Sequence, residues 1–276
     1  MVMNFEVDKN KCTQCGLCAS DCPVLIINAK TEFPTIKEGK ENQCIKCQHC
    51  LAICPSEAIS IWGKKPENSI SVSEPIPSVK DMENLIKTRR SIRKFKNEEI
   101  DKSLIHHIIS TASYAPTGHN ANSVQFTVVD NKTDMRKFRD MAYQGIRKAF
   151  KENRIPASKI FLNDFHNLWK TKQIDVIFRN APHLLIVSAP KKNTTPKTDS
   201  CIAMSYFELL ANCYGIGTLW NGYAKWVIDE IVPVIKESIG IPDNHLVAAT
   251  MSFGISAVKY ARSIQNNSVN IMEVKF

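Results

Sequence analysis

The residues with the clearest chemistry are eight cysteines, which form two copies of one pattern. The first copy is Cys12, Cys15, Cys18 and Cys22, followed by Pro23, and the second is Cys44, Cys47, Cys50 and Cys54, followed by Pro55. Every interval is the same, which indicates an internal duplication. Four thiols within eleven residues are too dense for a structural zinc site, which usually takes two separated pairs.

Residues 1–10 lack the basic-then-apolar pattern of a secretory signal. We therefore expect a cytoplasmic protein, in which clustered cysteines stay reduced and bind metal rather than form disulfides. No apolar run approaches the roughly 18 residues that cross a bilayer, so no membrane partner is expected.

The run C-x2-C-x2-C-x3-C-P predicts how two [4Fe–4S] clusters share their ligands. The first three cysteines of a run wrap one cluster, and the fourth binds the other cluster. The proline that follows redirects the chain. One cluster would be held by Cys12, Cys15, Cys18 and Cys54, and the other by Cys44, Cys47, Cys50 and Cys22. The pattern resembles bacterial-type ferredoxins, and this resemblance covers residues 1–62.

Charge is distributed unevenly over the 276 residues, whose formal net charge is +9. Residues 1–62 carry six Lys and seven Asp or Glu, whereas the remainder carries 30 Lys or Arg and 20 Asp or Glu. Such a basic body favours anionic ligands. No nucleic-acid recognition motif is visible, so nucleic acid is not expected as the main partner.

The elements that must position a second site follow an expected linker at residues 63–78, which is rich in Pro, Ser and Lys. Apolar spacing predicts helices over 79–88, from an Asn97 N-cap to before Pro116, over 133–150 and from an Asp199 N-cap to Tyr214. Strands are predicted at 124–130, 183–189 and 246–253. Residues 155–180 suit a covering segment, and Pro233 should lie near the start of a further helix. Residues 79–276 are therefore α/β or α+β, with helices covering a sheet.

Four motifs in this part carry groups that suit a flat, anionic ligand. KTRRSIRKFK (87–96) offers guanidinium donors to an anion, and APTGHNANS (115–123) offers amides and hydroxyls to a heterocycle. GIGTLWNG (215–222) is interpreted as a glycine-rich turn that a flat ligand can approach, and GISAVKYAR (254–262) adds two more cations. In this order the motifs resemble those of the FMN-binding nitroreductase family, over residues 80–276.

That resemblance implies an α+β domain with a mixed or antiparallel sheet, and a homodimer with FMN at the subunit interface. The FMN-binding residues that it implies are Arg89, Arg90, Ser91, Arg93, Pro116, Thr117, Asn120, Asn122, Leu219, Trp220, Asn221, Gly222, Lys259 and Arg262. Arg89 and Arg262 would contact the phosphate. The loop residues Pro116 to Asn122 would come from the partner subunit. Arg93 and Asn221 are the catalytic candidates, because a cation beside the ring stabilises the charge that reduction adds.

The chain departs from the family pattern on the substrate side. Asn122-Ser123-Val124 stands where many relatives have Gln-Pro-Trp after the loop asparagine, and Asn221 stands where some carry a glutamate. His119 in the loop is either a proton donor or a plain loop histidine. The identity of the acceptor therefore stays open.

The expected function is an oxidoreductase that passes electrons from two [4Fe–4S] clusters to FMN and reduces nitroaromatic, quinone or similar electron-poor molecules. No G-x-G-x-x-G fingerprint marks a dinucleotide fold, so the donor is NAD(P)H bound transiently or an external ferredoxin or flavodoxin. The alternatives are a flavin reductase or dehalogenase-like enzyme, and a non-catalytic redox sensor or electron carrier.

Overall fold

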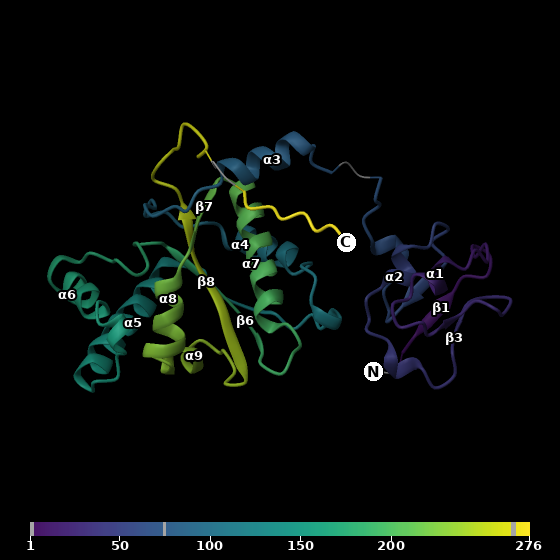
Figure 1. Ribbon diagram of the computed structural model, residues 1–276, viewed down its shortest axis with the longest axis horizontal. Helices are drawn as coiled ribbons and strands as arrows, with labels where there is room; N and C mark the ends of the chain where they lie inside the picture. The colour runs from purple at the N-terminus through teal and green to yellow at the C-terminus, as the bar shows by residue number, and fades with distance from the viewer. Residues whose placement is uncertain (1–2, 74–75, 266–268) are drawn as a thin grey trace. The chain divides into compact units, whose positions relative to one another are not determined.

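The computed structural model describes residues 3–73, 76–265 and 269–276. The chain divides into two compact units, namely Met1–Pro77 with His119–Ala121, and Ser78–Gly118 with Asn122–Phe276. Figure 1 shows the elements of both. None of the helices within the described ranges has the length and apolar character that a membrane span requires.

The described part of the first unit contains two short antiparallel strand pairs and two one-turn helices. Strand β1 (Phe5–Val7) pairs antiparallel with β4 (Ile59–Ile61), and β2 (Ile27–Asn28) pairs antiparallel with β3 (Thr35–Ile36). The helices are α1 (Leu17–Ser20) and α2 (His49–Ala52), with the 3-10 turns η1 (Glu41–Gln43) and η2 (Pro66–Asn68). Three cysteines are buried in its apolar core, namely Cys18, Cys22 and Cys50. The other buried core residues are Ile26, Ile27, Leu51, Ile59 and Ile61.

The duplication extends from the sequence to the backbone of this unit. Residues with left-handed φ recur at the same places in both copies, as the pairs Gln14 (57°) and Lys46 (57°), Gly16 (75°) and Gln48 (61°), and Leu25 (54°) and Glu57 (53°). Left-handed φ is uncommon outside glycine, so its repetition in three pairs shows that the two copies fold alike.

The second unit is built on a four-stranded antiparallel sheet with strand order β5-β6-β8-β7. These strands are β5 (Gln125–Val129), β6 (His183–Pro190), β7 (Ile216–Trp220) and β8 (His245–Ile255). Successive side chains of β6 point to opposite faces. Leu184 and Ile186 join one core cluster, and Leu185 and Val187 join another.

Helices cover both faces of this sheet, as Figure 1 shows. One face is covered by α4 (Lys102–Ala112) and α7 (Pro196–Cys213). The other is covered by α5 (Lys132–Lys151), α6 (Leu162–Lys172), α8 (Gly222–Trp226), the π-helical turn η5 (Val227–Ile231) and α9 (Val234–Ser238). The unit therefore has three layers with a core on each side of the sheet, which confirms the α+β class.

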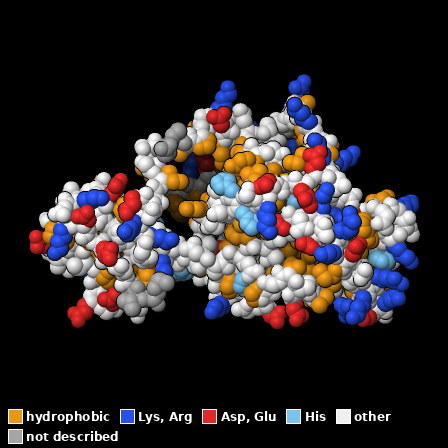
Figure 2. Space-filling view, turned by 180° about the vertical axis from the view of Figure 1, so that it is seen from behind, with side chains coloured by type: hydrophobic (Ala, Val, Ile, Leu, Met, Phe, Trp, Pro, Cys, Tyr) orange, Lys and Arg blue, Asp and Glu red, His pale blue; other side chains and the backbone are white. Residues whose placement is uncertain are grey.

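The surface of this larger unit is rich in cations. Lys and Arg side chains are prominent on the face of it that Figure 2 shows, as expected from the excess of basic residues after residue 62.

Helix α3 (Val79–Thr88) begins this unit, and Ser78 caps it by accepting a hydrogen bond from Asp81 N. The predicted helix over 79–88 is confirmed.

Two helix starts differ from the predictions. Asp101, not Asn97, is the N-cap of α4, because its carboxylate accepts from Ser103 N and Leu104 N. Thr195, not Asp199, precedes α7, and Asp199 lies inside the first turn of that helix. There it accepts from Gly118 N at 3.1 Å and Thr195 Oγ1 at 2.8 Å. An acidic residue near a helix start can thus serve a neighbouring loop instead of its own helix.

The segment GIGTLWNG is a strand rather than the glycine-rich turn that was predicted. Its residues Ile216–Trp220 form β7, paired with β8 along its whole length. Of the two cysteines outside the runs, Cys201 packs against the core and Cys213 is exposed.

The basic segment 89–96 lies beside β7 and the end of β8, where backbone hydrogen bonds hold it. Ile92 N donates to Thr218 O and Lys96 N to Ile255 O, both at 2.8 Å, and Ala257 N donates to Lys94 O at 2.9 Å. The close packing of this segment needs glycine on β7, because a Cβ on Gly217 would lie 2.7 Å from Ile92 Cγ1. On β8, a Cβ on Gly254 would lie 2.6 Å from Pro182 Cδ and 3.3 Å from Phe95 Cδ1.

Candidate cofactor sites

Two cavities in the first unit are each lined by four cysteines. One cavity is lined by Cys12, Cys15, Cys18 and Cys54. The second is lined by Cys22, Cys44, Cys47 and Cys50. Each cavity thus takes three cysteines from one run and the fourth from the other run, which are the two sets that the spacing predicts as ligands.

Hydrogen-bond donors surround the sulfurs of these cavities. Ala58 N donates to Cys54 Sγ at 3.3 Å, Lys46 N donates to Cys44 Sγ at 3.4 Å, and Trp62 Nε1 donates to Cys44 Sγ at 3.4 Å. Donors aimed at sulfur stabilise thiolate charge. The walls are otherwise largely apolar, with Ile59 at the first cavity and Ile26, Ile27 and Ile61 at the second.

Burial sets the protonation of the deeper thiols. It raises the pKa of Cys50 to about 12 and raises that of Cys18, whereas the backbone N–H of Leu17 lowers the pKa of Cys15. A buried thiol of this kind stays neutral at pH 7 unless a metal replaces its proton.

The donor set fits iron–sulfur clusters. Four soft sulfur ligands per cavity, an apolar wall and N–H donors to sulfur are the features by which proteins hold and tune such clusters. Within the described ranges, no three His, Cys, Asp or Glu side chains converge on one point to share a single ion. Cluster ligands have no need to converge, because each thiolate binds a different iron.

The second unit contains a cavity at the end of β7. The predicted site residues that line it are Arg93, Leu219, Trp220, Asn221 and Gly222, and the other lining residues are Ile177, Arg179, Tyr223 and Trp226. The wall thus combines three large aromatic rings with two guanidinium groups. A planar ligand with negative charge suits such a wall.

Asn221 is buried and joins three segments at the cavity wall. Its Nδ2 donates to Ile177 O at 2.9 Å and to Ser252 Oγ at 2.8 Å, and its Oδ1 accepts from Ala224 N at 3.0 Å as the N-cap of α8. The amide therefore fixes the end of β7 and the start of α8. Gly222 follows directly, and a Cβ there would meet nothing within 4 Å.

Arg89 is tied to Trp220 through Glu208, a buried residue of α7. Glu208 Oε1 accepts from Arg89 Nη1 at 3.2 Å, and Glu208 Oε2 accepts from Trp220 Nε1 at 3.0 Å. Thr218 Oγ1 also donates to this carboxylate at 3.2 Å. The hydrogen bond to Glu208 orients the Trp220 ring at the cavity, and the ion pair leaves further Arg89 donors for other partners.

The other predicted FMN contacts lie outside the lining of this cavity in the described chain. Pro116 and Thr117 precede the 3-10 turn η3 (Gly118–Asn120), where Thr117 Oγ1 accepts from Asn122 N at 3.0 Å. Ser91 forms a parallel bridge with Thr218. Lys259 and Arg262 are exposed after β8, and Arg90 lies over the Tyr260 ring at 5.9 Å. Their predicted roles need a partner subunit or a bound cofactor.

Sequence reasoning missed Ile177, Arg179, Tyr223 and Trp226. The first two lie on the connection between α6 and β6, within the stretch 155–180 for which only a covering role was predicted. Tyr223 and Trp226 belong to α8, a helix too short to show a period. The usable signal was composition, because Trp226 and Tyr223 follow the GIGTLWNG motif within six residues.

Comparisons with known proteins agree with this two-part organisation. The model of the nitroreductase family matches residues 86–255, and that of the 4Fe-4S dicluster domain matches residues 11–59. A protein of Archaeoglobus fulgidus, named as a candidate NADH dehydrogenase/NAD(P)H nitroreductase, is 27% identical over 62% of this chain and 82% of its own length. The iodotyrosine deiodinase of Thermotoga neapolitana is 25% identical over 51% of this chain and 73% of its own.

Among solved structures, a nitroreductase with bound FMN from Bacteroides fragilis has a similar fold. Its TM-score is 0.57 with 22% identity, and the match covers 70% of this chain and 99% of that one. An iodotyrosine deiodinase bound to FMN and 3-iodo-L-tyrosine gives a TM-score of 0.52 with 19% identity, over 71% of this chain and 100% of that one. These likenesses bear on the fold of the second unit.

Proposed function

This chain is an oxidoreductase that belongs to the nitroreductase family and carries a 4Fe-4S dicluster domain, and we propose that it conducts electrons from two [4Fe–4S] clusters to FMN. The acceptor is a nitroaromatic, a quinone or a similar electron-poor small molecule. The observation that carries the proposal is the division of eight cysteines into two cavities of four, on a chain whose other unit has an arginine- and aromatic-lined cavity.

The residues of the first unit suit a pair of clusters. Cys12, Cys15, Cys18 and Cys54 would hold one, and Cys44, Cys47, Cys50 and Cys22 the other. Clusters of this type carry single electrons. Because Cys22 and Cys54 each line the cavity of the other run, loss of either should harm the cluster outside its own run.

The cavity of the second unit suits a flavin. FMN, when bound, supplies both one-electron and two-electron chemistry, so it can join cluster donors to a two-electron acceptor. The chain supplies two guanidinium groups and three aromatic rings. Arg93 faces this cavity with its guanidinium, which stabilises negative charge at the ligand. Arg89, Arg90, Ser91, Lys259 and Arg262 remain the proposed contacts to the phosphate and sugar alcohol.

We propose that Asn221 is a positioning residue of the cavity wall. Its Nδ2 and Oδ1 hold Ile177, Ser252 and Ala224, so we assign it the placement of the cavity wall beside Gly222. Its proposed contribution to catalysis comes through this placement.

A homodimer is part of the proposal, with Pro116, Thr117, Asn120 and Asn122 reaching the partner's flavin. Support comes from apolar side chains that are exposed in the single chain, on α3 and near the C-terminus. These are Val79, Met82, Ile86, Val269, Ile271, Met272, Val274 and Phe276. Exposed apolar surface of this kind marks association sites. A cytoplasmic location is proposed as well, since reduced thiols persist there.

A dehalogenase-like reaction is the second candidate. The identity to the Thermotoga neapolitana iodotyrosine deiodinase favours it. Reductive removal of an aromatic halide would use the same electron route, so a halogenated aromatic should be assayed beside a nitroaromatic. A non-catalytic redox sensor, in contrast, would bind both cofactors and turn over neither acceptor.

The deciding experiment is anaerobic purification followed by cofactor and donor analysis. We expect flavin bands over a broad iron–sulfur absorption, about one FMN and about eight iron atoms per chain. Reduced ferredoxin, dithionite and NADPH are then compared as donors with nitrofurazone as acceptor. A colourless protein, or bound FMN that no donor reduces, would sink the proposal.

Cysteine variants separate the electron route from the flavin chemistry. Cys54→Ser should remove the cluster of the first run and abolish ferredoxin-driven turnover, while FMN stays bound. The matched control is Cys201→Ser, which lies on α7 in the other unit. Equal ferredoxin-driven rates in both variants would show that the clusters are not on the route.

A further inference from the structure

The connection between α6 and β6 presents two residues to the cavity of the second unit, Ile177 and Arg179. Its backbone is unusual, because Gln173, Arg179 and Asn180 have φ values of 54°, 60° and 53°. Non-glycine residues adopt this left-handed region at an energetic cost, and they stay there only where the surroundings hold them. Arg179 is therefore held in place rather than loosely exposed.

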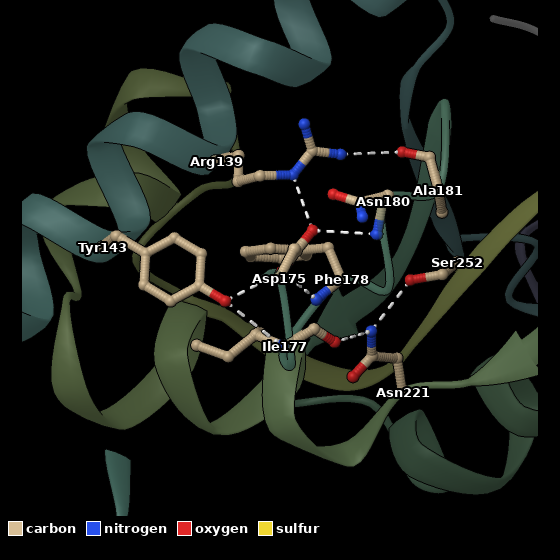
Figure 3. A network of polar contacts seen from close by, with 9 residues as sticks. All are labelled: Arg139, Tyr143, Asp175, Ile177, Phe178, Asn180, Ala181, Asn221 and Ser252. Carbon is tan, nitrogen blue, oxygen red and sulfur yellow. Dashed lines mark hydrogen bonds and ion pairs between the residues drawn. The ribbon is translucent and has the colours of Figure 1, made fainter. Parts of the chain in front are cut away.

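The buried carboxylate of Asp175 holds this connection from within, as Figure 3 shows. It accepts from Arg139 Nε at 2.7 Å and from Tyr143 Oη at 2.8 Å. It also accepts from the backbone N–H groups of Phe178 at 2.8 Å and Asn180 at 3.0 Å. The residues on both sides of Arg179 are thus bonded to one carboxylate whose side chain has no exposed surface.

A second set of bonds fixes the connection to the cavity wall. Tyr143 Oη accepts from Ile177 N at 3.3 Å, and Ile177 O accepts from Asn221 Nδ2 at 2.9 Å (Figure 3). Phe178 is fully buried, with its ring edge-on to Phe138 and Tyr143. Because Phe178 points into the core, its neighbour Arg179 is directed to the cavity side, where it is half-buried.

The charge balance of the cavity identifies what Arg179 can bind. Arg93 and Arg179 are the charged residues of the lining, which contains no Asp or Glu. Across residues 3–73, 76–265 and 269–276, Arg179 forms no ion pair with a carboxylate, whereas Arg93 Nη1 donates to Ser91 O at 3.3 Å. A half-buried guanidinium without a counter-charge is a binding group for an anion, and its planar fork matches a carboxylate.

The remaining lining residues define the body of the ligand. Tyr223 and Trp226 supply aromatic rings and Ile177 supplies an apolar contact, and none of the three is a proposed FMN contact. Aromatic rings prefer to stack on or meet the edge of another ring. The wall therefore suits a planar aromatic molecule with an acidic group at one end.

We propose that Arg179 is a specificity-determining residue that binds the carboxylate of an aromatic acid acceptor. The proposal rests on the proposed function, because it names the acceptor class of the same cavity. Asp175, Arg139 and Tyr143 are positioning residues in this scheme: they hold Arg179 at the wall and do not touch the acceptor.

The test compares two acceptors that differ in charge and share one nitroaromatic ring, 4-nitrobenzoate and 4-nitrobenzyl alcohol. Arg179→Gln should lower the ratio of kcat/KM for the acid to that for the alcohol by about tenfold or more, the worth of one charged hydrogen bond. Arg179→Lys, which keeps the charge and loses the fork, should give an intermediate ratio. The control is Arg147→Gln, which removes the same charge from an exposed position on α5 and should leave the ratio unchanged.

A binding measurement keeps the inference independent of turnover. Benzoate, which cannot be reduced at a nitro group, is titrated calorimetrically into the FMN-loaded protein. Its Kd should rise by about tenfold or more in Arg179→Gln and stay the same in Arg147→Gln. If the protein turns over neither nitro compound, the proposed function fails while this titration still decides the role of Arg179.

Three results would overturn the inference. The first is loss of FMN from Arg179→Gln, which would place the guanidinium on the cofactor. The second is an equal loss of kcat/KM for the acid and the alcohol. The third is a benzoate affinity that is absent in the original protein or unchanged in the variant.

Discussion

Ile92 occupies the space that a side chain on Gly217 would need. A Cβ at residue 217 would lie 2.7 Å from Cγ1, 3.0 Å from Cβ and 3.1 Å from Cγ2 of Ile92. Ile92 is buried and its N–H donates to Thr218 O, so the basic segment is fixed against β7 at this point. The glycine is therefore required by the packing of Arg89 to Arg93 on the sheet rather than by the approach of a ligand.

Gly217→Ala should destabilise the protein by about 1–3 kcal/mol, because overpacking forces a shift of Ile92 or of β7. Chemical denaturation of the holoprotein checks this. The control is Cys213→Ala, an exposed position at the end of α7, where the free energy of unfolding should change by no more than about 0.5 kcal/mol. Equal effects of the two variants would contradict the packing argument.

The ion pair between Asp175 and Arg139 should contribute more to the free energy of unfolding than the hydroxyl of Tyr143. Asp175→Asn leaves the Arg139 guanidinium, whose side chain is only 11% exposed, without its counter-charge, and we expect a loss of about 3–5 kcal/mol. Tyr143→Phe removes one donor to Asp175 and the acceptor of Ile177 N, which should cost about 1–2 kcal/mol.

Denaturation of both variants checks the order of these losses. A smaller loss in Asp175→Asn than in Tyr143→Phe would show that the ion pair does not stabilise the connection. Benzoate binding by Tyr143→Phe should weaken as well, since the hydroxyl helps to place Arg179.

Buried His183 should make stability fall as the pH is lowered. Burial lowers the pKa of this imidazole below its ordinary value of 6.5. Its Nε2 accepts from Ile100 N at 3.0 Å and so carries no proton in the folded chain. The unfolded chain takes up a proton near pH 6.5 and the folded chain does so only at lower pH, so stability is full above that pH and is lost as the pH falls through it.

The measurement is the midpoint of thermal unfolding between pH 7.5 and 5.5. One proton contributes a slope of at most about 1.4 kcal/mol per pH unit. His183→Gln should flatten the dependence, whereas His107→Gln, an exposed change on α4, should leave it as it is. Parallel curves for both variants would exclude His183 as the source.

Trp62 should tune one cluster and not the other. Its Nε1 donates to Cys44 Sγ at 3.4 Å, and a donor to sulfur stabilises the negative charge that reduction adds. Trp62→Phe keeps a ring beneath Lys46, whose Nζ lies 4.5 Å from the indole centroid, and removes only the donor. The reduction potential of the cluster at Cys44 should become more negative.

A redox titration followed by electron paramagnetic resonance distinguishes the two clusters. The potential of the cluster at Cys12 serves as the internal control and should not move. A shift of both potentials, or of neither, would contradict the assigned hydrogen bond.

Much of this organisation could be predicted where one residue type repeats at fixed spacing. The cysteine runs predicted two sets of four, and the same sets line the two cavities, because the repeated spacing puts three thiols of a run on one cavity and the fourth on the other. Helix α3 (Val79–Thr88) was likewise predicted to its bounds, since Ser78 caps it locally. Local chemistry decides both features.

The rest depends on contacts that are distant in sequence. Gly217 and Gly215 made Ile216–Trp220 look like a turn, and only the proximity of Ile92 explains a glycine inside a strand. Asp199 resembles an N-cap, but its carboxylate bonds to Gly118, 81 positions away. Arg179 reaches the cavity because Asp175 is buried beneath it, and no pattern in residues 155–180 shows that.

The exchange of the fourth cysteine between the two runs makes the first unit indivisible. A truncation after Pro23 or before Cys44 would leave neither cavity with four sulfurs, because each is completed from the other copy. Neither copy can therefore be removed and leave the other with a complete set of four ligands.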